Sequence, residues 1–82
     1  MGVAQGSKLA VEWYAKAAAQ GHAIAQYNLG VCYERSEGVA QDFKLAAAWY
    51  GRAAAQGFAG AGTSRNACLA RLKTSAGGTR RA

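Results

Sequence analysis

The sequence predicts an all-α fold in which antiparallel helical hairpins stack into a solenoid. Three observations predict it. About a quarter of the 82 residues are alanine, the best helix former, and proline is absent. A segment of 22 residues occurs twice, with an offset of 36 residues from Gly2 to Gly38. Within each copy, apolar residues recur every three or four positions, which is the period of one helix face. We therefore expect about four helices within residues 1–73.

The repeat aligns without a gap. Residues 2–23 read GVAQGSKLAVEWYAKAAAQGHA, residues 38–59 read GVAQDFKLAAAWYGRAAAQGFA, and 15 of the 22 aligned positions are identical. Both copies contain a Trp-Tyr pair and an Ala-Ala-Ala-Gln-Gly run. Periods of about 20–50 residues are typical of solenoids, in which each unit buries its apolar face against its neighbours.

The helices predicted over residues 8–20 and 43–56 are two copies of one design. In the second copy, Leu45, Trp49 and Ala53 are spaced four residues apart and form an apolar stripe. The first copy has the same stripe at the corresponding positions. Because the aromatic pairs recur with the period, we expect them at the contacts between repeats. These residues are Trp13, Tyr14, Trp49 and Tyr50.

Capping residues mark the ends of these two helices. Asp42 is a natural N-cap for the second copy, because its carboxylate can accept the free backbone amides of the first turn. Gly57 follows the second copy and Gly21 follows the first, each as a left-handed C-cap. The first copy has Gly6 where Asp42 stands, so Ser7 is its remaining candidate cap.

A helix of a second type is predicted over residues 23–35, with Ala25, Leu29 and Tyr33 turned inward. Gly30 lies beside Leu29 and costs this helix roughly 1 kcal/mol of propensity. We therefore expect a neighbouring helix that packs too close to Gly30 for any side chain. A loop over residues 36–41, which contains Gly38, then turns the chain into the next helix.

The pattern decays after Ala61. A fourth helix is still predicted over residues 60–73, with Cys68, Leu69 and Leu72 on one face. Residues 74–82, TSAGGTRRA, contain nothing to bury and predict a disordered basic tail.

Residues 2–61 closely resemble the Sel-1-like repeat family, a relative of the tetratricopeptide repeat. The matching positions are Ala25, Leu29, Gly30, Tyr33, Gly38, Val39, Asp42, Ala46, Trp49, Tyr50, Ala53, Ala54, Gly57 and Ala59. The resemblance implies a right-handed α-solenoid that acts as an adaptor or scaffold for protein complexes. The family usually has glycine where this chain has Ser36, so either serine tolerates that turn or the turn has another geometry.

The resemblance also implies where a partner peptide or helix binds. In tetratricopeptide-like solenoids the first helix of each unit lines the concave groove, and here that helix covers residues 23–35. The side chains left for a partner are Ile24, Tyr27, Asn28, Val31 and Arg35. The Asn28 amide can bond both a donor and an acceptor of a peptide backbone, although a solvated or capping role stays open. Tyr27 and Val31 either form an apolar patch of the groove or pack against the next hairpin.

Most of the charge lies at one end of the chain. The net charge is +6, but residues 1–59 carry only five of the ten basic residues and all four acids. The remaining bases are Arg65, Arg71, Lys73, Arg80 and Arg81. An alternative function is therefore the binding of nucleic acid or another acidic surface by the basic tail. The absence of interleaved aromatic residues disfavours single-stranded nucleic acid as the ligand.

No grouping of residues predicts catalysis, a cofactor or a metal site. The single histidine, His22, lies at a glycine turn where the second copy has Phe58, which predicts a capping or surface role. Cys32 and Cys68 stand one repeat apart, so with one histidine they cannot form a zinc site within one protomer. Reduced thiols are favoured over a disulfide. We therefore expect a protein that is not an enzyme.

The sequence shows neither a signal peptide nor an apolar run of the roughly 20 residues that span a bilayer. A cytoplasmic location is therefore the default expectation. Repeat arrays usually need about three units, so a piece of a longer repeat protein is a further interpretation. Exposed ends around Trp13 and Ala61 also predict self-association.

Overall fold

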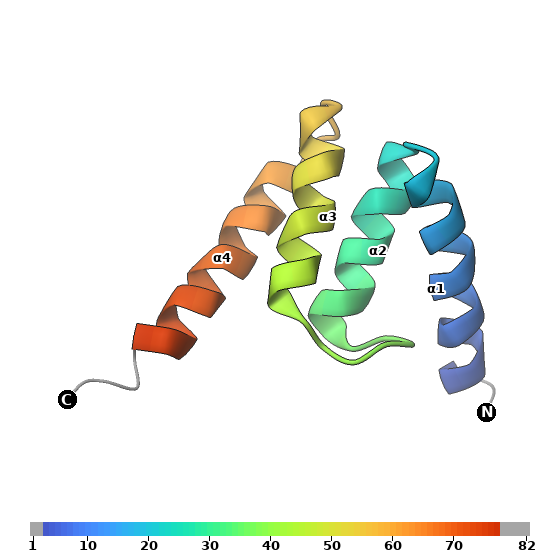
Figure 1. The fold of residues 1–82 in the computed structure, drawn as a ribbon, viewed down its shortest axis with the longest axis horizontal. Helices are drawn as coiled ribbons and strands as arrows, with labels where there is room; N and C mark the ends of the chain where they lie inside the picture. The colour runs from blue at the N-terminus through green and yellow to red at the C-terminus, as the bar shows by residue number, and fades with distance from the viewer. Residues whose placement is uncertain (1–2, 78–82) are drawn as a thin grey trace.

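The computed structural model describes the backbone of residues 3–77 and the side chains of residues 8–73. The described residues form four α-helices and no strand, namely α1 (Val3–Ala19), α2 (Ala23–Arg35), α3 (Phe43–Ala55) and α4 (Ala61–Gly77). Each helix runs antiparallel to its neighbour, and the four stand side by side in chain order (Figure 1). The predicted all-α fold of stacked helical hairpins is confirmed.

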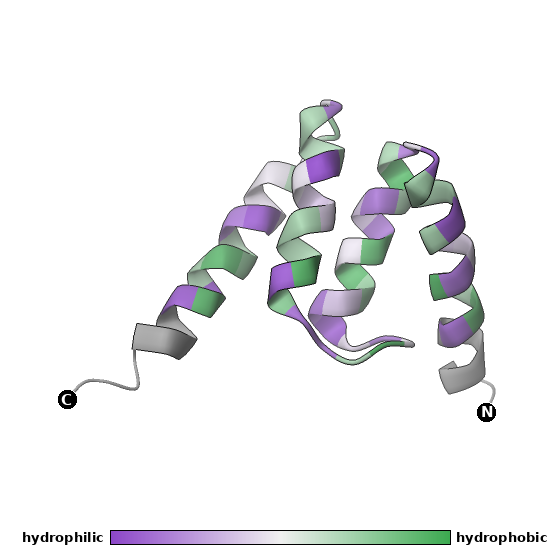
Figure 2. Ribbon diagram, in the orientation of Figure 1, coloured by the Kyte–Doolittle hydropathy of each residue, from purple (hydrophilic) through white to green (hydrophobic). Residues whose placement is uncertain are grey.

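The array is thin, with Cα extents of 43 × 34 × 16 Å. Polar and apolar residues are interleaved along every helix (Figure 2). Every helix therefore keeps a wide exposed surface and contributes only a narrow stripe to the core. This arrangement leaves side chains on both faces free for contacts with other molecules.

The starts of α1 and α3 differ although their sequences repeat. Asp42 lies before α3 with an extended backbone, and its Oδ1 accepts the amides of Lys44 and Leu45, both at 3.0 Å. The first copy has Gly6 at this position and therefore lacks the carboxylate that defines a helix start. As a result α1 begins at Val3, where the sequence predicted a start at residue 8.

At the other end, α4 continues to Gly77, beyond the predicted end at residue 73. Residues 74–76 contain neither glycine nor proline, so nothing stops the helix before the glycine pair. Residues 78–82 of the predicted tail lie outside the described residues.

Two small clusters form the core. One joins α1 to α2 through Ala18, Ala25 and Leu29, with Trp49 of α3 packed against it. The other joins α3 to α4 through Ala46, Ala47, Tyr50 and Cys68. Tyr33 packs against both clusters, so the two hairpins share one continuous interior.

The two ends of the array differ. Trp13 on α1 is 71% exposed, as expected for an end of the stack. Ala61 is fully buried at the start of α4, so the prediction of an exposed end around Ala61 is wrong. The reason is that α4 does form and its first turn packs beside α3, where Gly62 approaches Ala54. Among the three residues predicted on one α4 face, Cys68 is buried and Leu72 half-buried, but Leu69 is exposed.

Gly30 brings α2 into close contact with α3. A Cβ atom at Gly30 would lie 2.8 Å from two ring carbons of Tyr50 and 3.2 Å from the carbonyl oxygen of Ala46. Real Cβ atoms essentially never approach another atom to 2.8 Å. Close packing of α2 on α3 therefore requires glycine at this position, although glycine lowers the helix propensity of α2.

The turn after α2 places a serine in the left-handed region. Ser36 has φ 59° and ψ 44°, and it is the single non-glycine residue with positive φ among those described. Its hydroxyl donates to the carbonyl oxygen of Val39 at 3.0 Å. Gly38 follows with φ 81°. The serine thus adopts the conformation for which helix ends normally use glycine.

Replacing Ser36 by glycine should stabilise the fold by about 0.5–1 kcal/mol, because glycine removes the cost of a Cβ atom in the left-handed conformation. The gain is reduced by the lost Ser36 hydroxyl bond and by the greater freedom of glycine in the unfolded chain. Urea unfolding measures the difference. The matched variant Ser36→Ala keeps the strained conformation, loses the bond and should be less stable than the parent. A destabilised Ser36→Gly chain would show that the turn is not strained.

Candidate functional site

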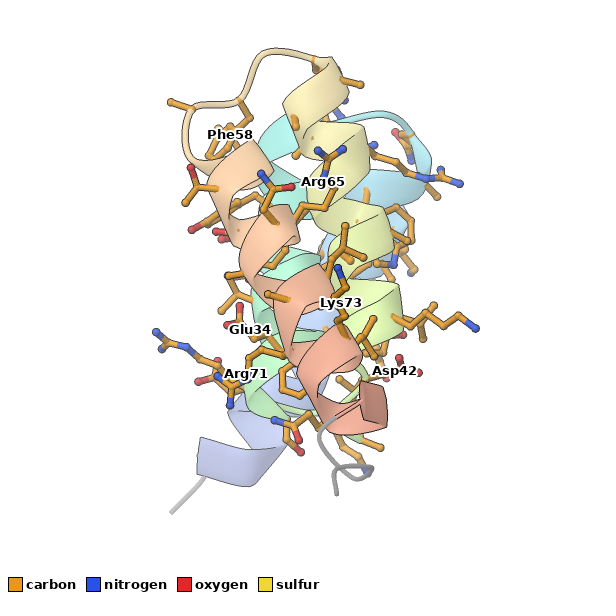
Figure 3. All side chains as sticks on the ribbon, turned by 90° about the vertical axis from the view of Figure 1, so that its left-hand side faces the viewer. Glu34, Asp42, Phe58, Arg65, Arg71 and Lys73 are labelled. Carbon is orange, nitrogen blue, oxygen red and sulfur yellow. The ribbon has the colours of Figure 1, made fainter. Side chains whose placement is uncertain are left out.

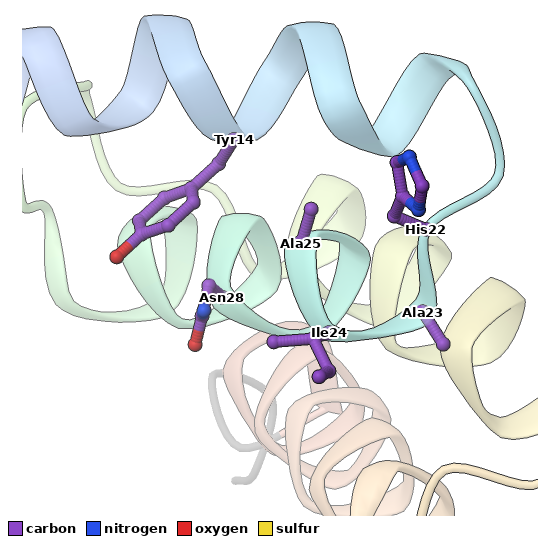
Figure 4. Close-up of a pocket in the computed structure, with 6 residues that line it drawn as sticks. All are labelled: Tyr14, His22, Ala23, Ile24, Ala25 and Asn28. Atoms are coloured by element: carbon purple, nitrogen blue, oxygen red, sulfur yellow. The ribbon is translucent and has the colours of Figure 1, made fainter.

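An open hollow of about 470 Å³ lies between α1 and the first turns of α2 (Figure 4). Six residues line it: Tyr14, His22, Ala23, Ile24, Ala25 and Asn28. Tyr14 and Asn28 lie at one end of the hollow and His22 at the other (Figure 4). Between these polar groups the lining consists of alanine and isoleucine side chains. The hollow therefore combines an apolar middle with polar groups at both ends.

The local sequence explains how these side chains meet. Gly21 has φ 93°, a conformation that lets the chain reverse between α1 and α2. Ile24 and Asn28 are four residues apart, so they lie one turn apart on the same face of α2. Ala23 and Ala25 are too small to fill the space between the two helices. The short turn and the small residues together keep the hollow open.

His22 lies at the N-cap position of α2, but its side chain makes no capping hydrogen bond. Its backbone carbonyl accepts the amide of Gln26 at 3.0 Å, and the side chain is exposed. The imidazole is therefore free to contact a ligand in the hollow.

Hydrogen bonds from two glutamine side chains fix the turn between α1 and α2. Gln26 is only 4% exposed, and its amide nitrogen donates to the carbonyl oxygen of Ala18 at 3.1 Å. Gln56, at the end of α3, donates to the carbonyl oxygen of Gly21 at 2.8 Å and to Gln26 Oε1 at 3.0 Å. These bonds link the α1–α2 turn to α3 and hold the lining residues in place.

The five residues predicted to contact a partner do not all lie in the hollow. Ile24 and Asn28 line it. The Tyr27 ring centroid lies 5.2 Å from Tyr50 and 4.9 Å from Phe58, and Val31 packs against the α3–α4 cluster. Tyr27 and Val31 therefore pack against the next hairpin, the second of the two alternatives left open above.

Arg35 ends α2, far from the hollow. Its side chain is exposed, and its Nη1 lies 4.0 Å from Glu37 Oε2. An exposed pair at this distance contributes little to stability. Arg35 is therefore free to interact with another charged group.

Sequence reasoning missed four of the six lining residues, namely Tyr14, His22, Ala23 and Ala25. Tyr14 repeats as Tyr50, which is buried in the core, and this equivalence assigned it a structural role. The available signal was a difference between the copies, since His22 stands where the second copy has Phe58. A repeat position that departs from its copy is free to differ in function.

Comparison with known proteins agrees with this architecture. The Sel1 repeat family model matches residues 1–22 and 23–58. The chain belongs to the Sel1 repeat family. No curated protein and no solved structure matches the chain.

The second Sel1 match covers α2 and α3, so these two helices form one complete unit. The first match covers α1, which corresponds to the later part of a unit, and α4 lies beyond both matches. The hollow is thus formed between one Sel1 unit and the helix that precedes it. Sel1 repeats generally mediate protein–protein interactions and are typically non-catalytic.

The two cysteines of this Sel1 chain are both buried. Burial raises the pKa of the Cys32 and Cys68 thiols, both of which are free, so little thiolate forms near neutral pH.

Among the described residues, no group of three or more histidine, cysteine or acidic side chains could hold a metal ion. No helix in the described part of the chain is long and apolar enough to span a membrane.

Proposed function

We propose that this chain is a non-catalytic adaptor or scaffold module that binds a peptide or helix of a partner protein along α2. The observation that carries the proposal is the hollow between α1 and α2. Its lining side chains come from α1, α2 and the turn between them, and Ile24 among them is 65% exposed. An exposed isoleucine beside a half-buried asparagine is suited to recognition.

The chemistry of the hollow suits a peptide. Its apolar middle can take one aliphatic or aromatic side chain of a partner, with Ile24 as the main contact. The Asn28 amide can donate to one backbone carbonyl and accept from one backbone amide of the same segment. The Tyr14 hydroxyl and the His22 ring offer further hydrogen bonds at the two ends.

The surface extends beyond the hollow along α2. Ile24, Asn28 and Arg35 are spaced by four and seven residues and so lie along one stripe of the helix. Val31 is half-buried, whereas Arg35 is exposed and can pair with an acidic residue of the partner. An elongated partner could therefore contact the hollow and Arg35 together.

The double variant Ile24→Ser with Asn28→Ala should weaken partner binding about tenfold or more, because it removes both the apolar contact and the backbone hydrogen bonds. Partners are captured from a lysate with the parent chain, and their affinities for each variant are then measured. Tyr27 and Val31 are left intact because their replacement would disturb the packing of α2 on α3.

The matched control is Leu69→Ser with Asn66→Ala, which removes an exposed apolar residue and an exposed amide from α4. Circular dichroism verifies that both variants keep the fold. Equal binding by the parent and the Ile24/Asn28 variant would refute the assignment of the hollow. Loss of binding in the α4 variant alone would show that the partner binds to α4.

The basic residues support an alternative ligand less well. Arg65, Arg71 and Lys73 are exposed on α4 (Figure 3). The Arg71 guanidinium lies over the Phe43 ring at 5.1 Å. Arg80 and Arg81 lie outside the described residues. Binding of nucleic acid or an acidic surface by the tail therefore stays a prediction that rests on the charge alone.

A further inference from the structure

The outer face of α1 is defined by four residues that border one shallow depression, namely Leu9, Glu12, Trp13 and Lys16. We propose that two copies of this chain pair through it, antiparallel and about a two-fold axis, with Glu12 of each copy beside Lys16 of the other. The surface is separate from the hollow, so the pairing does not depend on the proposed function.

The composition of this face is unusual for a surface exposed to solvent. Trp13 is 71% exposed and Leu9 52% exposed, and both border one shallow depression with Glu12 and Lys16. Tryptophan is the side chain that contributes most often to binding hot spots when water is excluded from it. An exposed tryptophan with an aliphatic neighbour one turn away therefore marks a contact surface.

The second copy of the repeat shows how the same residue behaves when covered. Trp49, the counterpart of Trp13, is half-buried against the cluster of Ala18, Ala25 and Leu29. Arg52, the counterpart of Lys16, lies over its ring at 4.9 Å. The α1–α2 pair thus covers this position in α3, whereas Trp13 on α1 is 71% exposed.

A second copy could cover α1 with its α4 only by repeating the α2–α3 contact. That contact requires Gly30, because the Tyr50 ring occupies the space of a Cβ atom. At the offset of 36 residues, α4 has Asn66 in place of Gly30 and Arg65 in place of Leu29. Tyr14 of another copy could not approach Asn66 as closely. Head-to-tail stacking of copies is therefore blocked at α4.

The charges of α1 favour pairing with another α1. Glu12 and Lys16 are one turn apart on the same face. In a two-fold contact, residue i of one copy meets residue j of the other, and the reverse also holds. An antiparallel pair therefore forms two Glu12–Lys16 contacts around the two Trp13 side chains, whereas a parallel pair would place Glu12 against Glu12.

Glu12, the acidic residue that makes this face self-complementary, occurs in α1 and not at the corresponding position of α3. The counterpart of Glu12 in α3 is Ala48, although 15 of the 22 aligned residues are identical. The repeat unit whose tryptophan is exposed is thus also the unit that carries the complementary charges. This combination favours a second copy of this protein chain as the partner on the outer face of α1.

Sedimentation of the full chain tests the proposal. We expect the parent chain to dimerise at concentrations of about 100 μM or below, and Trp13→Gln to raise the dimer dissociation constant about tenfold or more. Glu12→Lys and Lys16→Glu should each weaken the dimer. The double variant with both changes exchanges the charges and should restore it.

Leu69→Gln provides the control, because it changes an exposed apolar residue on α4 and should leave the dimer intact. All substituted residues are exposed, so circular dichroism should show an unchanged helix content. A monomeric parent chain would overturn the proposal. Dissociation caused by Leu69→Gln but not by Trp13→Gln would overturn it as well, since the contact would then lie on α4.

Discussion

Replacing Tyr50 by alanine should destabilise the chain by about 3–5 kcal/mol, the usual cost of removing a buried aromatic ring. Tyr50 is 1% exposed and lies in the cluster that joins α3 to α4, beside Gly30 of α2. A domain of this size is typically stable by only about 4–12 kcal/mol. We therefore expect Tyr50→Ala to be partly or wholly unfolded by circular dichroism at 25 °C.

The variant Tyr50→Phe separates the ring from its hydroxyl. The Tyr50 hydroxyl donates to Glu34 Oε1 at 2.6 Å, so this variant should cost about 1–2 kcal/mol while keeping the packing. Burial, together with the bond to Glu34, raises the pKa of Tyr50 well above its ordinary value. Unfolded tyrosine loses its proton near pH 10, so the stability from this group is full below about pH 10 and falls above it.

Urea unfolding between about pH 8 and 11 checks this sign, since the fall in stability should be smaller in Tyr50→Phe than in the parent. Tyr14→Phe removes the hydroxyl at the corresponding position of the first copy and serves as the control for the loss of a tyrosine hydroxyl. If Tyr50→Ala remained as stable as Tyr50→Phe, the α2–α3–α4 junction would not depend on this ring.

Replacing Gly30 by alanine should destabilise the chain by about 1–3 kcal/mol, although alanine is the better helix former by about 1 kcal/mol. The new methyl group would lie 2.8 Å from the Tyr50 ring and 3.2 Å from the Ala46 carbonyl oxygen, so α2 and α3 must separate. The free energy of unfolding in urea measures the loss.

A matched glycine exists on α3. A Cβ atom at Gly51 would lie 3.4 Å from the Arg65 side chain, which is an ordinary contact with a flexible group. Gly51→Ala should therefore stabilise the chain through propensity alone. If both substitutions stabilised it, the close packing of α2 on α3 would be refuted.

The fold class could be predicted because the same helical pattern occurs in both copies of the repeat. Period, capping residues and the glycine turn all point to helical hairpins, and the matches to the Sel1 repeat support the family resemblance. Gly30 was predictable for the same reason, since glycine inside a helix implies a close neighbour. The extension of α1 to Val3 was not expected, because it results from the missing carboxylate at Gly6 and not from any helix signal.

The surfaces were harder to predict than the core. Identical Trp-Tyr pairs suggest identical roles, but the environment of a side chain depends on the helices that lie next to it. Trp13 is therefore exposed while Trp49 is half-buried. The hollow depends on the angle and spacing of α1 and α2, which periodicity does not give. Tyr27 could not be assigned for the same reason, because its partners are Tyr50 of α3 and Phe58 of the turn between α3 and α4.

The pair of Tyr14 and Tyr50 has a consequence for how such proteins acquire new contacts. One tyrosine is held in the interior by Gly30, and its duplicate lines an open hollow. The same aromatic residue thus stands once in the interior and once, half-buried against the α1–α2 cluster, at the edge of the hollow. The interior copy preserves the architecture, and the outer copy can vary in its neighbours, as His22 in place of Phe58 illustrates. In a short array of this kind, Tyr50 holds the helices together, whereas Tyr14 remains accessible at the edge of the hollow.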